Sequence, residues 1–224
     1  MQLIKVFILF LSLCFTQNYS NSYGDKHFLK ILNSEKHWEV INTTEDSIII
    51  SIKHFDDYEI NALKVQKKTN ISLNKITETI YDIDNYDRLL TNSNTIKTQL
   101  INENQKFKIA HQLIEVDIPF FDNREYVFQI NKGSFNPSIE KILCYWEILE
   151  YSNEFKDIFN NQNIVLNEGA GIWKYQPIDK NNNIIEYILF LNPGGFIPQI
   201  MIDMLNKNSM VTLFRDVMNY ENPK

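Results

Sequence analysis

Side chains that could carry out chemistry are few in this sequence of 224 residues, and their spacing matches no catalytic or metal-binding arrangement. The histidines lie far apart, at His27, His37, His54 and His111. Zinc sites take their ligands from closely spaced Cys and His residues, and nucleophilic catalysis needs a base beside the nucleophile. The sequence has neither pattern, so we predict no metal, no cofactor and no catalytic residue.

The stretch Gly169-Ala170-Gly171 is too short to be a phosphate-binding loop. Glycine inside a strand often marks a place where another group comes close to the backbone. We therefore expect these glycines to relieve crowding at the start of a strand.

The N-terminal residues have the pattern of a secretory signal peptide. Lys5 precedes an apolar stretch from Val6 to Phe15, which is too short to cross a bilayer core of ~30 Å as a helix. Small residues at Ser20 and Ser22 suit cleavage after Ser22. We predict a signal peptide at residues 1–22, a domain at residues 23–224, and export to the periplasm or the extracellular space. A retained anchor or a buried helix is the alternative.

Cleavage after Ser22 would leave Cys144 as the only cysteine of the mature chain, so that chain could form no internal disulfide. Cys144 lies in an apolar run at residues 142–146. A free cysteine in such a run is more often a small core residue than a nucleophile.

Composition and charge restrict the class of protein. Hydrophobic residues make up 44% of the sequence and charged residues 22%, as in an ordinary globular protein with one core. The net charge of −6 provides no diffuse positive field to attract nucleic acid. We expect a monomer with no nucleic-acid partner.

The periodicity of apolar residues predicts the elements that must position any site. Strands are predicted at residues 38–41, 47–53, 62–67, 95–101, 106–115, 124–131, 141–150, 171–178 and 184–191. Helices are predicted at residues 25–37, 72–90 and 199–218. In the second helix Ile76, Ile80 and Ile83 share one face with Leu90, and Ser72 is a suitable cap. Residues 117–123 and 151–170 are predicted to be irregular loops.

Several predicted strands are apolar at both odd and even positions. Trp173 and Tyr175 alternate with Ile172, and Tyr187 alternates with Ile188. Since neighbouring side chains of a strand point to opposite faces, one helix layer accounts for only half of these residues.

The last predicted helix is rich in methionine. Pro198 suits a helix start. Four methionines follow, Met201, Met204, Met210 and Met218, and the apolar positions on or near one face are Ile200, Met204, Val211, Phe214 and Met218. Methionine adapts to irregular or changing partners. The helix therefore either covers a cavity whose contents vary or fills an ordinary core.

Four stretches, in this order and spacing, resemble the START family of lipid-transfer domains related to steroidogenic acute regulatory protein. They are Ile83-Asp84 with Tyr86-Asp87, Ile109-Ala110-His111-Gln112, Arg124-Glu125-Tyr126-Val127 and Gly195-Phe196-Ile197-Pro198. The resemblance covers nearly all of the mature chain. It implies an α+β helix-grip fold, in which a curved antiparallel β-sheet wraps around a long C-terminal α-helix.

The family encloses a hydrophobic molecule in a tunnel between the sheet and the last helix, so the resemblance implies a lipid-binding and lipid-carrying protein with transient membrane contact. Sterol-handling members place an acid and a base in the tunnel, where this sequence has Gln112 and Ile130. We therefore expect a ligand held by neutral hydrogen bonds and shape. The predicted ligand-binding residues are Gln112, His111, Arg124, Tyr126, Ile130, Trp173, Tyr187, Met201, Met204 and Leu205.

Alternatives remain for two of these residues and for the function. Arg124 is also expected to be structural, pairing with a nearby carboxylate, because a buried unpaired Arg is costly. His111 in a strand is also expected to be satisfied structurally. The alternative function is a polyketide cyclase or aromatase on the same fold, with Tyr126, Arg124 and His111 as polar groups.

Overall fold

The computed structural model describes residues 27–55, 58, 60–90, 95–116, 121–133, 141–195 and 199–220, with the backbone alone for residues 27 and 199–206. The predicted signal peptide, residues 117–120 of the predicted loop at 117–123 and the stretch Phe196-Ile197-Pro198 lie outside these residues. The predictions made for them stay predictions.

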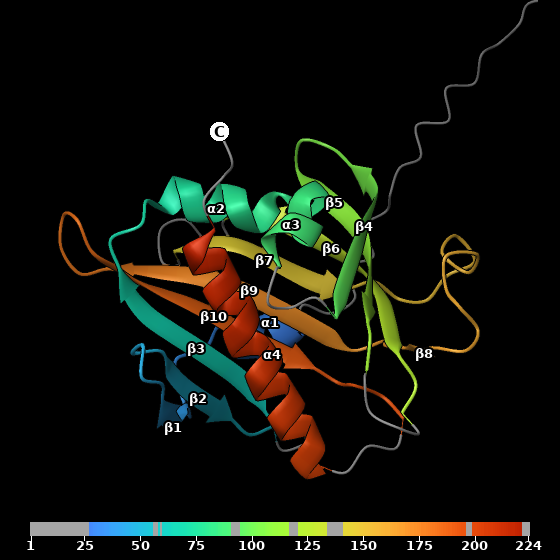
Figure 1. Ribbon diagram of the computed structural model, residues 1–224, viewed down its shortest axis with the longest axis horizontal. Helices are drawn as coiled ribbons and strands as arrows, with labels where there is room; N and C mark the ends of the chain where they lie inside the picture. The colour runs from blue at the N-terminus through green and yellow to red at the C-terminus, as the bar shows by residue number, and fades with distance from the viewer. Residues whose placement is uncertain are drawn as a thin grey trace, which may run out of the picture.

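The described strands form one sheet of ten, in the order β1-β2-β3-β10-β9-β7-β6-β5-β4, with β8 beside β6 (Figure 1). The strands are β1 (Glu39–Thr43), β2 (Ile49–Lys53), β3 (Ala62–Thr69), β4 (Ile96–Glu103), β5 (Phe107–Ile114), β6 (Arg124–Lys132), β7 (Ile142–Ile148), β8 (Ile164–Val165), β9 (Gly169–Pro177) and β10 (Asn183–Leu191). All pairs are antiparallel except β6 with β8. The nine predicted strands are confirmed, and β8 is an addition within the predicted loop at residues 151–170.

An asparagine side chain closes the hairpin between β4 and β5, as expected of a residue that bonds its own backbone. Between β4 and β5, Asn104 Oδ1 accepts hydrogen bonds from the backbone N–H groups of Lys106 and Phe107, at 2.7 and 3.0 Å. Beyond a register shift between Leu100 and Asn102, the hairpin pairs Thr98 with Gln112, two residues that meet again in the candidate site.

The predicted helix at residues 72–90 is interrupted at Asp82. Its parts are α2 (Leu73–Tyr81), the 3-10 turn η1 (Ile83–Asn85) and α3 (Tyr86–Leu89). Ser72 caps α2 as predicted, since its Oγ accepts from Lys75 N at 3.1 Å. The backbone of Asp82 is no longer helical, and its carboxylate accepts a hydrogen bond from Asn85 Nδ2 at 3.0 Å. Such local side-chain bonds compete with helix continuation, which the apolar spacing alone could not reveal.

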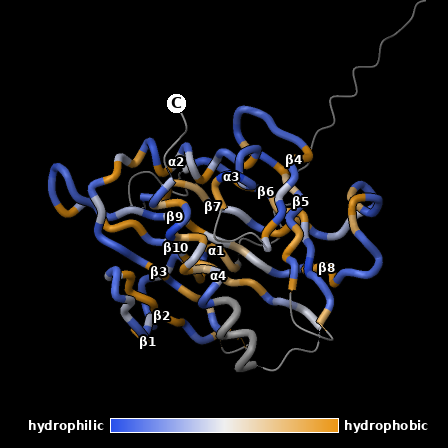
Figure 2. The backbone as a smooth tube through the Cα atoms, viewed as in Figure 1, coloured by the Kyte–Doolittle hydropathy of each residue, from blue (hydrophilic) through white to orange (hydrophobic). Residues whose placement is uncertain are grey.

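Both faces of the sheet are covered, which explains the apolar residues at both strand positions. One face carries α4 (Gln199–Asn219), α2 and α3, while α1 (His27–Leu32) packs on β9 and β10 from the opposite side (Figure 1). Leu29 and Leu32 of α1 form a second core with Ile172, Ile188 and others. Figure 2 shows that hydrophobic residues concentrate along the central strands, whereas the peripheral hairpin turns are mostly hydrophilic.

Helix α4 is attached to the sheet by an apolar stripe. Val211 and Phe214 are buried as predicted, and Met210 and Val217 widen the stripe. The rings of Phe214 and Trp173 stack with their centroids 5.6 Å apart. Among the described helices, none is both long enough and apolar enough to cross a membrane.

Candidate functional site: a cavity under the last helix

A cavity of about 350 Å³ lies between α4 and the sheet. This volume falls at the lower end of the ~300–1,000 Å³ that ligand pockets occupy. Its described lining residues are Ile80, Tyr86, Leu89, Leu90, Thr95, Ile96, Gln112, Ile114, Glu115, Val116, Arg124, Tyr126, Phe128, Ile130, Trp146, Leu166, Trp173, Tyr187, Leu189, Leu191, Pro193, Ser209, Met210, Leu213 and Val217. Most are aliphatic or aromatic, so the cavity is suited to an apolar molecule.

The structure brings six of the predicted ligand-binding residues to this cavity: Gln112, Arg124, Tyr126, Ile130, Trp173 and Tyr187. They come from β5, β6, β9 and β10, which no local sequence pattern could place side by side. The side chains of Met201, Met204 and Leu205 lie outside the described part of the chain, and their predicted role is unchanged.

Helix α4 contributes Ser209, Met210, Leu213 and Val217 to the lining. The positions 210, 213 and 217 follow helical spacing. The predicted apolar face of this helix included Val211 and Phe214, and positions 210, 213 and 217 were not among the predicted ligand-binding residues. Their spacing was the signal that could have found them.

His111 is not brought to the cavity. In β5 it faces away from Gln112, because consecutive side chains of a strand point to opposite faces. Its Nε2 lies 2.9 Å from Glu125 Oε2, and Glu125 Oε1 accepts from the backbone N–H of Asn160 at 2.7 Å. His111 thus joins the sheet to the segment at 151–163 on the opposite face, which agrees with its expected structural role, while the ligand-binding role also predicted for it stays a prediction.

Arg124 lies at the cavity but makes backbone contacts instead of the expected ion pair. Its Nε donates to Pro193 O at 3.3 Å, its Nη1 donates to Asp122 O, and neither partner is a carboxylate. Burial lowers the pKa of the guanidinium and the charge of Asp122 opposes this effect. Arg124 therefore fastens the turn that leads from β10 toward α4 to the β5–β6 connection.

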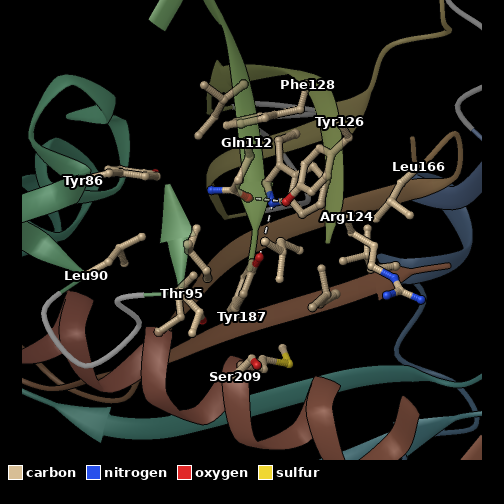
Figure 3. A pocket seen from close by; sticks show the side chains of 18 of the residues that line it. Tyr86, Leu90, Thr95, Gln112, Arg124, Tyr126, Phe128, Leu166, Tyr187 and Ser209 are labelled. Carbon is tan, nitrogen blue, oxygen red and sulfur yellow. Dashed lines mark hydrogen bonds between the residues drawn. The ribbon is translucent and has the colours of Figure 1, made fainter. Parts of the chain in front are cut away.

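Neutral polar groups from adjacent strands meet at the cavity wall (Figure 3). The hydroxyl of Tyr126 donates to Gln112 Oε1, and Gln112 Nε2 donates to Thr98 Oγ1 at 2.8 Å. These three residues are direct cross-strand neighbours on β4, β5 and β6. Gln112 is thus held by its neighbours on both adjacent strands.

A third hydrogen bond in the wall joins Trp146 of β7 to Tyr187 of β10, with Nε1 donating to the hydroxyl oxygen at 3.3 Å. Strand β9 lies between them, and Gly171 is paired with Trp146. A Cβ at Gly171 would lie 2.2 Å from Trp146 Nε1. The missing side chain lets the indole pass over β9, which confirms the expectation that this glycine relieves crowding.

Aromatic rings make this wall rigid. Trp173 stacks on Tyr187 with centroids 4.3 Å apart, and Tyr126 stacks on Trp146 at 6.0 Å. Such pairs contribute about 0.5–1.5 kcal/mol beyond their buried area. The polar atoms of the wall are therefore held in place by packing as well as by hydrogen bonds.

The tyrosines of the cavity are neutral. Burial raises the pKa of Tyr86, Tyr126 and Tyr187 well above the ordinary value of 10.0. Burial also raises the pKa of the Cys144 thiol to about 12, and this side chain is fully covered. These groups can donate or accept hydrogen bonds, but at neutral pH they are poor bases and nucleophiles.

Comparison with solved structures identifies the fold, whereas the sequence comparisons found no match. A scan of protein-family models found no match to the sequence, and a search of curated proteins found none either. The structure is similar to that of the STAR-related lipid transfer protein from Xanthomonas axonopodis, with a TM-score of 0.65 and 11% identity over 80% of this chain and 96% of that one.

Two human structures are also similar. STARD10 has a TM-score of 0.66 and 11% identity over 89% of this chain and 80% of that chain. StAR-related lipid transfer protein 5 has a TM-score of 0.61 and 8% identity over 86% and 89%. The chain therefore has the START-like helix-grip fold, and the predicted fold class is confirmed.

Proposed function

We propose that this protein binds one lipid or other hydrophobic small molecule in the cavity under α4 and carries it between membranes. The observation that supports this proposal most directly is the apolar, aromatic cavity between α4 and the sheet. Burying apolar ligand surface contributes about 25 cal/mol per Å², and a few fixed polar groups are enough to orient the ligand. The likeness to structures of lipid transfer proteins supports the same function.

The cyclase or aromatase alternative receives less support from the cavity. Tyr126 and Arg124, two of its three polar groups, line the cavity, but His111 faces the other side of the sheet. Within the described lining, the tyrosines are neutral and Arg124 is bonded to backbone carbonyls. We therefore favour binding and transfer over catalysis.

Export belongs to the same proposal. A carrier outside the cytoplasm, in the periplasm or secreted, would make transient contact with a membrane at each loading and release, and we propose that it acts as a monomer. N-terminal sequencing of the protein recovered from the host tests the predicted cleavage after Ser22. A mature protein that still begins at residue 1 would contradict it.

Two measurements test ligand binding. Native mass spectrometry of protein purified from its host should detect a bound apolar molecule, which lipid extraction then identifies. Titration with a fluorescent fatty-acyl lipid should show saturable binding. A protein that carries no apolar molecule and binds no such lipid is not a lipid carrier.

A pair of neighbouring variants assigns the binding to the cavity. Leu213→Trp places an indole into the lining, whereas Thr212→Trp places the same indole on a partly exposed position of α4 outside the described lining. Overfilling a packed site costs ~1–3 kcal/mol, so Leu213→Trp should weaken lipid binding at least about fivefold. Equal effects of the two variants would place the ligand elsewhere.

A further inference from the structure

Four cavity residues form what we call the tyrosine cluster: Gln112, Tyr126, Trp146 and Tyr187. Three hydrogen bonds of these side chains are already made, and each uses a donor of Gln112, Tyr126 or Trp146. The Tyr126 hydroxyl donates to Gln112, whose amide nitrogen donates in turn to Thr98. The donor of Tyr126 is thus occupied before any ligand arrives.

Tyr187 differs from Tyr126 because it is the acceptor in its hydrogen bond. An indole nitrogen can only donate, so Trp146 uses a lone pair of the Tyr187 oxygen and leaves its hydroxyl hydrogen available. Among the described residues, no acceptor for that hydrogen is found. Tyr187 is 5% exposed, and a buried donor without an acceptor costs roughly 1–3 kcal/mol. Figure 3 shows its hydroxyl directed toward Gln112 and Tyr126.

Charged groups offer no alternative anchor near this hydroxyl. Glu115 and Arg124 are the charged side chains of the described lining. The guanidinium of Arg124 is bonded to Pro193 and Asp122, and it points away from the tyrosine cluster in Figure 3. A carboxylate or phosphate placed at Tyr187 would therefore lose its hydration without gaining a cation, which is far costlier than burying a neutral group.

We propose that the end of the ligand at the tyrosine cluster is an uncharged oxygen, such as a hydroxyl or carbonyl, that accepts a hydrogen bond from Tyr187. The inference rests on the proposed function, since it concerns the same cavity. The Tyr187 hydroxyl would favour uncharged lipids with an oxygen at one end, such as long-chain alcohols or methyl esters. Hydrocarbons, and ligands with an ionised group at that end, would bind less tightly.

The test is competition against a bound fluorescent lipid with four probes of equal chain length: cetyl alcohol, methyl palmitate, palmitate and hexadecane. Wild-type protein should bind the alcohol and the ester about three- to tenfold more tightly than hexadecane, which is the range for one hydrogen bond. Palmitate, whose end is ionised, should compete more weakly than cetyl alcohol and methyl palmitate, whose oxygens are uncharged.

Tyr187→Phe keeps the ring stacked on Trp173 and removes the hydroxyl. It should abolish the preference for the alcohol and the ester while leaving the affinity for hexadecane unchanged. Tyr175→Phe is the matched control, because Tyr175 lies on β9 outside the described lining and should keep the wild-type ranking. A variant that is only less stable would lose affinity for all four probes together.

Three results would overturn the inference. Equal affinity for cetyl alcohol and hexadecane in wild-type protein would show that no polar group is recognised. Tightest binding of palmitate would show that a charged end is accepted. An unchanged ranking in Tyr187→Phe would assign the recognition to another residue. In each case the fluorescent lipid is still bound and the proposed function stands, whereas failure of every lipid to bind overturns both.

Discussion

Arg215 of α4 holds the carboxylate of Asp46, in the turn between β1 and β2, by two hydrogen bonds, with Nε 3.1 Å from Oδ2 and Nη2 2.8 Å from Oδ1. Lys67 of β3 lies 3.6 Å from the same carboxylate, and Thr44 Oγ1 donates to it at 2.6 Å. The contact ties the end of α4 to the edge of the sheet, on the side opposite the turn that Arg124 fastens.

Asp46→Asn should weaken this tie by a small amount that depends on pH. The Arg215 guanidinium holds the pKa of Asp46 well below its ordinary value of 3.8. Since the folded-state pKa is the lower one, the stabilisation is present above about pH 4 and is lost as the pH falls toward the folded-state pKa. Both side chains are more than a third exposed, so the expected loss near neutral pH is only about 0.2–1 kcal/mol.

Urea unfolding of wild-type protein and Asp46→Asn at several pH values measures this effect. The difference in unfolding free energy should shrink below about pH 4. Thr44→Val is a useful companion, since it removes one donor to the carboxylate and leaves Arg215 in place. A difference that grows on acidification would contradict the assignment.

Phe214→Ala should be far more damaging than any change at Arg215, because apolar packing attaches α4 more strongly than its ion pair. Phe214 is fully buried and stacks on Trp173. Truncating such a side chain typically costs about 3–5 kcal/mol. Hydrogen exchange of residues 207–219 should rise in Phe214→Ala well above its level in Arg215→Lys, and equal exchange in the two variants would show that the stack does not hold the helix.

Gly171→Ala should displace Trp146 and thereby disturb Tyr187. The added methyl group would lie 2.2 Å from Trp146 Nε1, and overpacking of this kind costs about 1–3 kcal/mol. Combining it with Trp146→Phe should recover part of the loss, because the smaller ring leaves room for the methyl group. Additive destabilisation in the double variant, measured by denaturant unfolding, would show that the two residues do not interact.

His111→Asn and Gln112→Leu should have different effects, because these adjacent residues lie on opposite faces of the sheet. His111→Asn removes the contact with Glu125 and should increase hydrogen exchange at residues 151–163 with no change in lipid affinity. Gln112→Leu removes the acceptor of the Tyr126 hydroxyl at the cavity and should alter lipid affinity. Loss of lipid binding in His111→Asn would show that His111 does take part in ligand binding.

Most of the fold could be predicted from the sequence because its elements carry strong periodicity. Nine strands and the positions of three helical segments followed from apolar spacing, although α1 ends at Leu32 and not at the predicted residue 37, and Ser72 followed from its capping chemistry. The break at Asp82 and the short strand β8 could not be predicted, because each depends on a few local hydrogen bonds and leaves no periodic signal.

For the candidate site, the sequence by itself determined the side chains that are available: apolar and aromatic residues on the strands, with the uncharged Gln112 and Ile130 among them. Only the tertiary structure decided which residues meet. It turned Gln112 inward and His111 outward, and it placed Trp146 across Gly171 onto Tyr187. The physical reason is that strands distant in sequence set these contacts through their order and register, and no single stretch of the chain encodes that order.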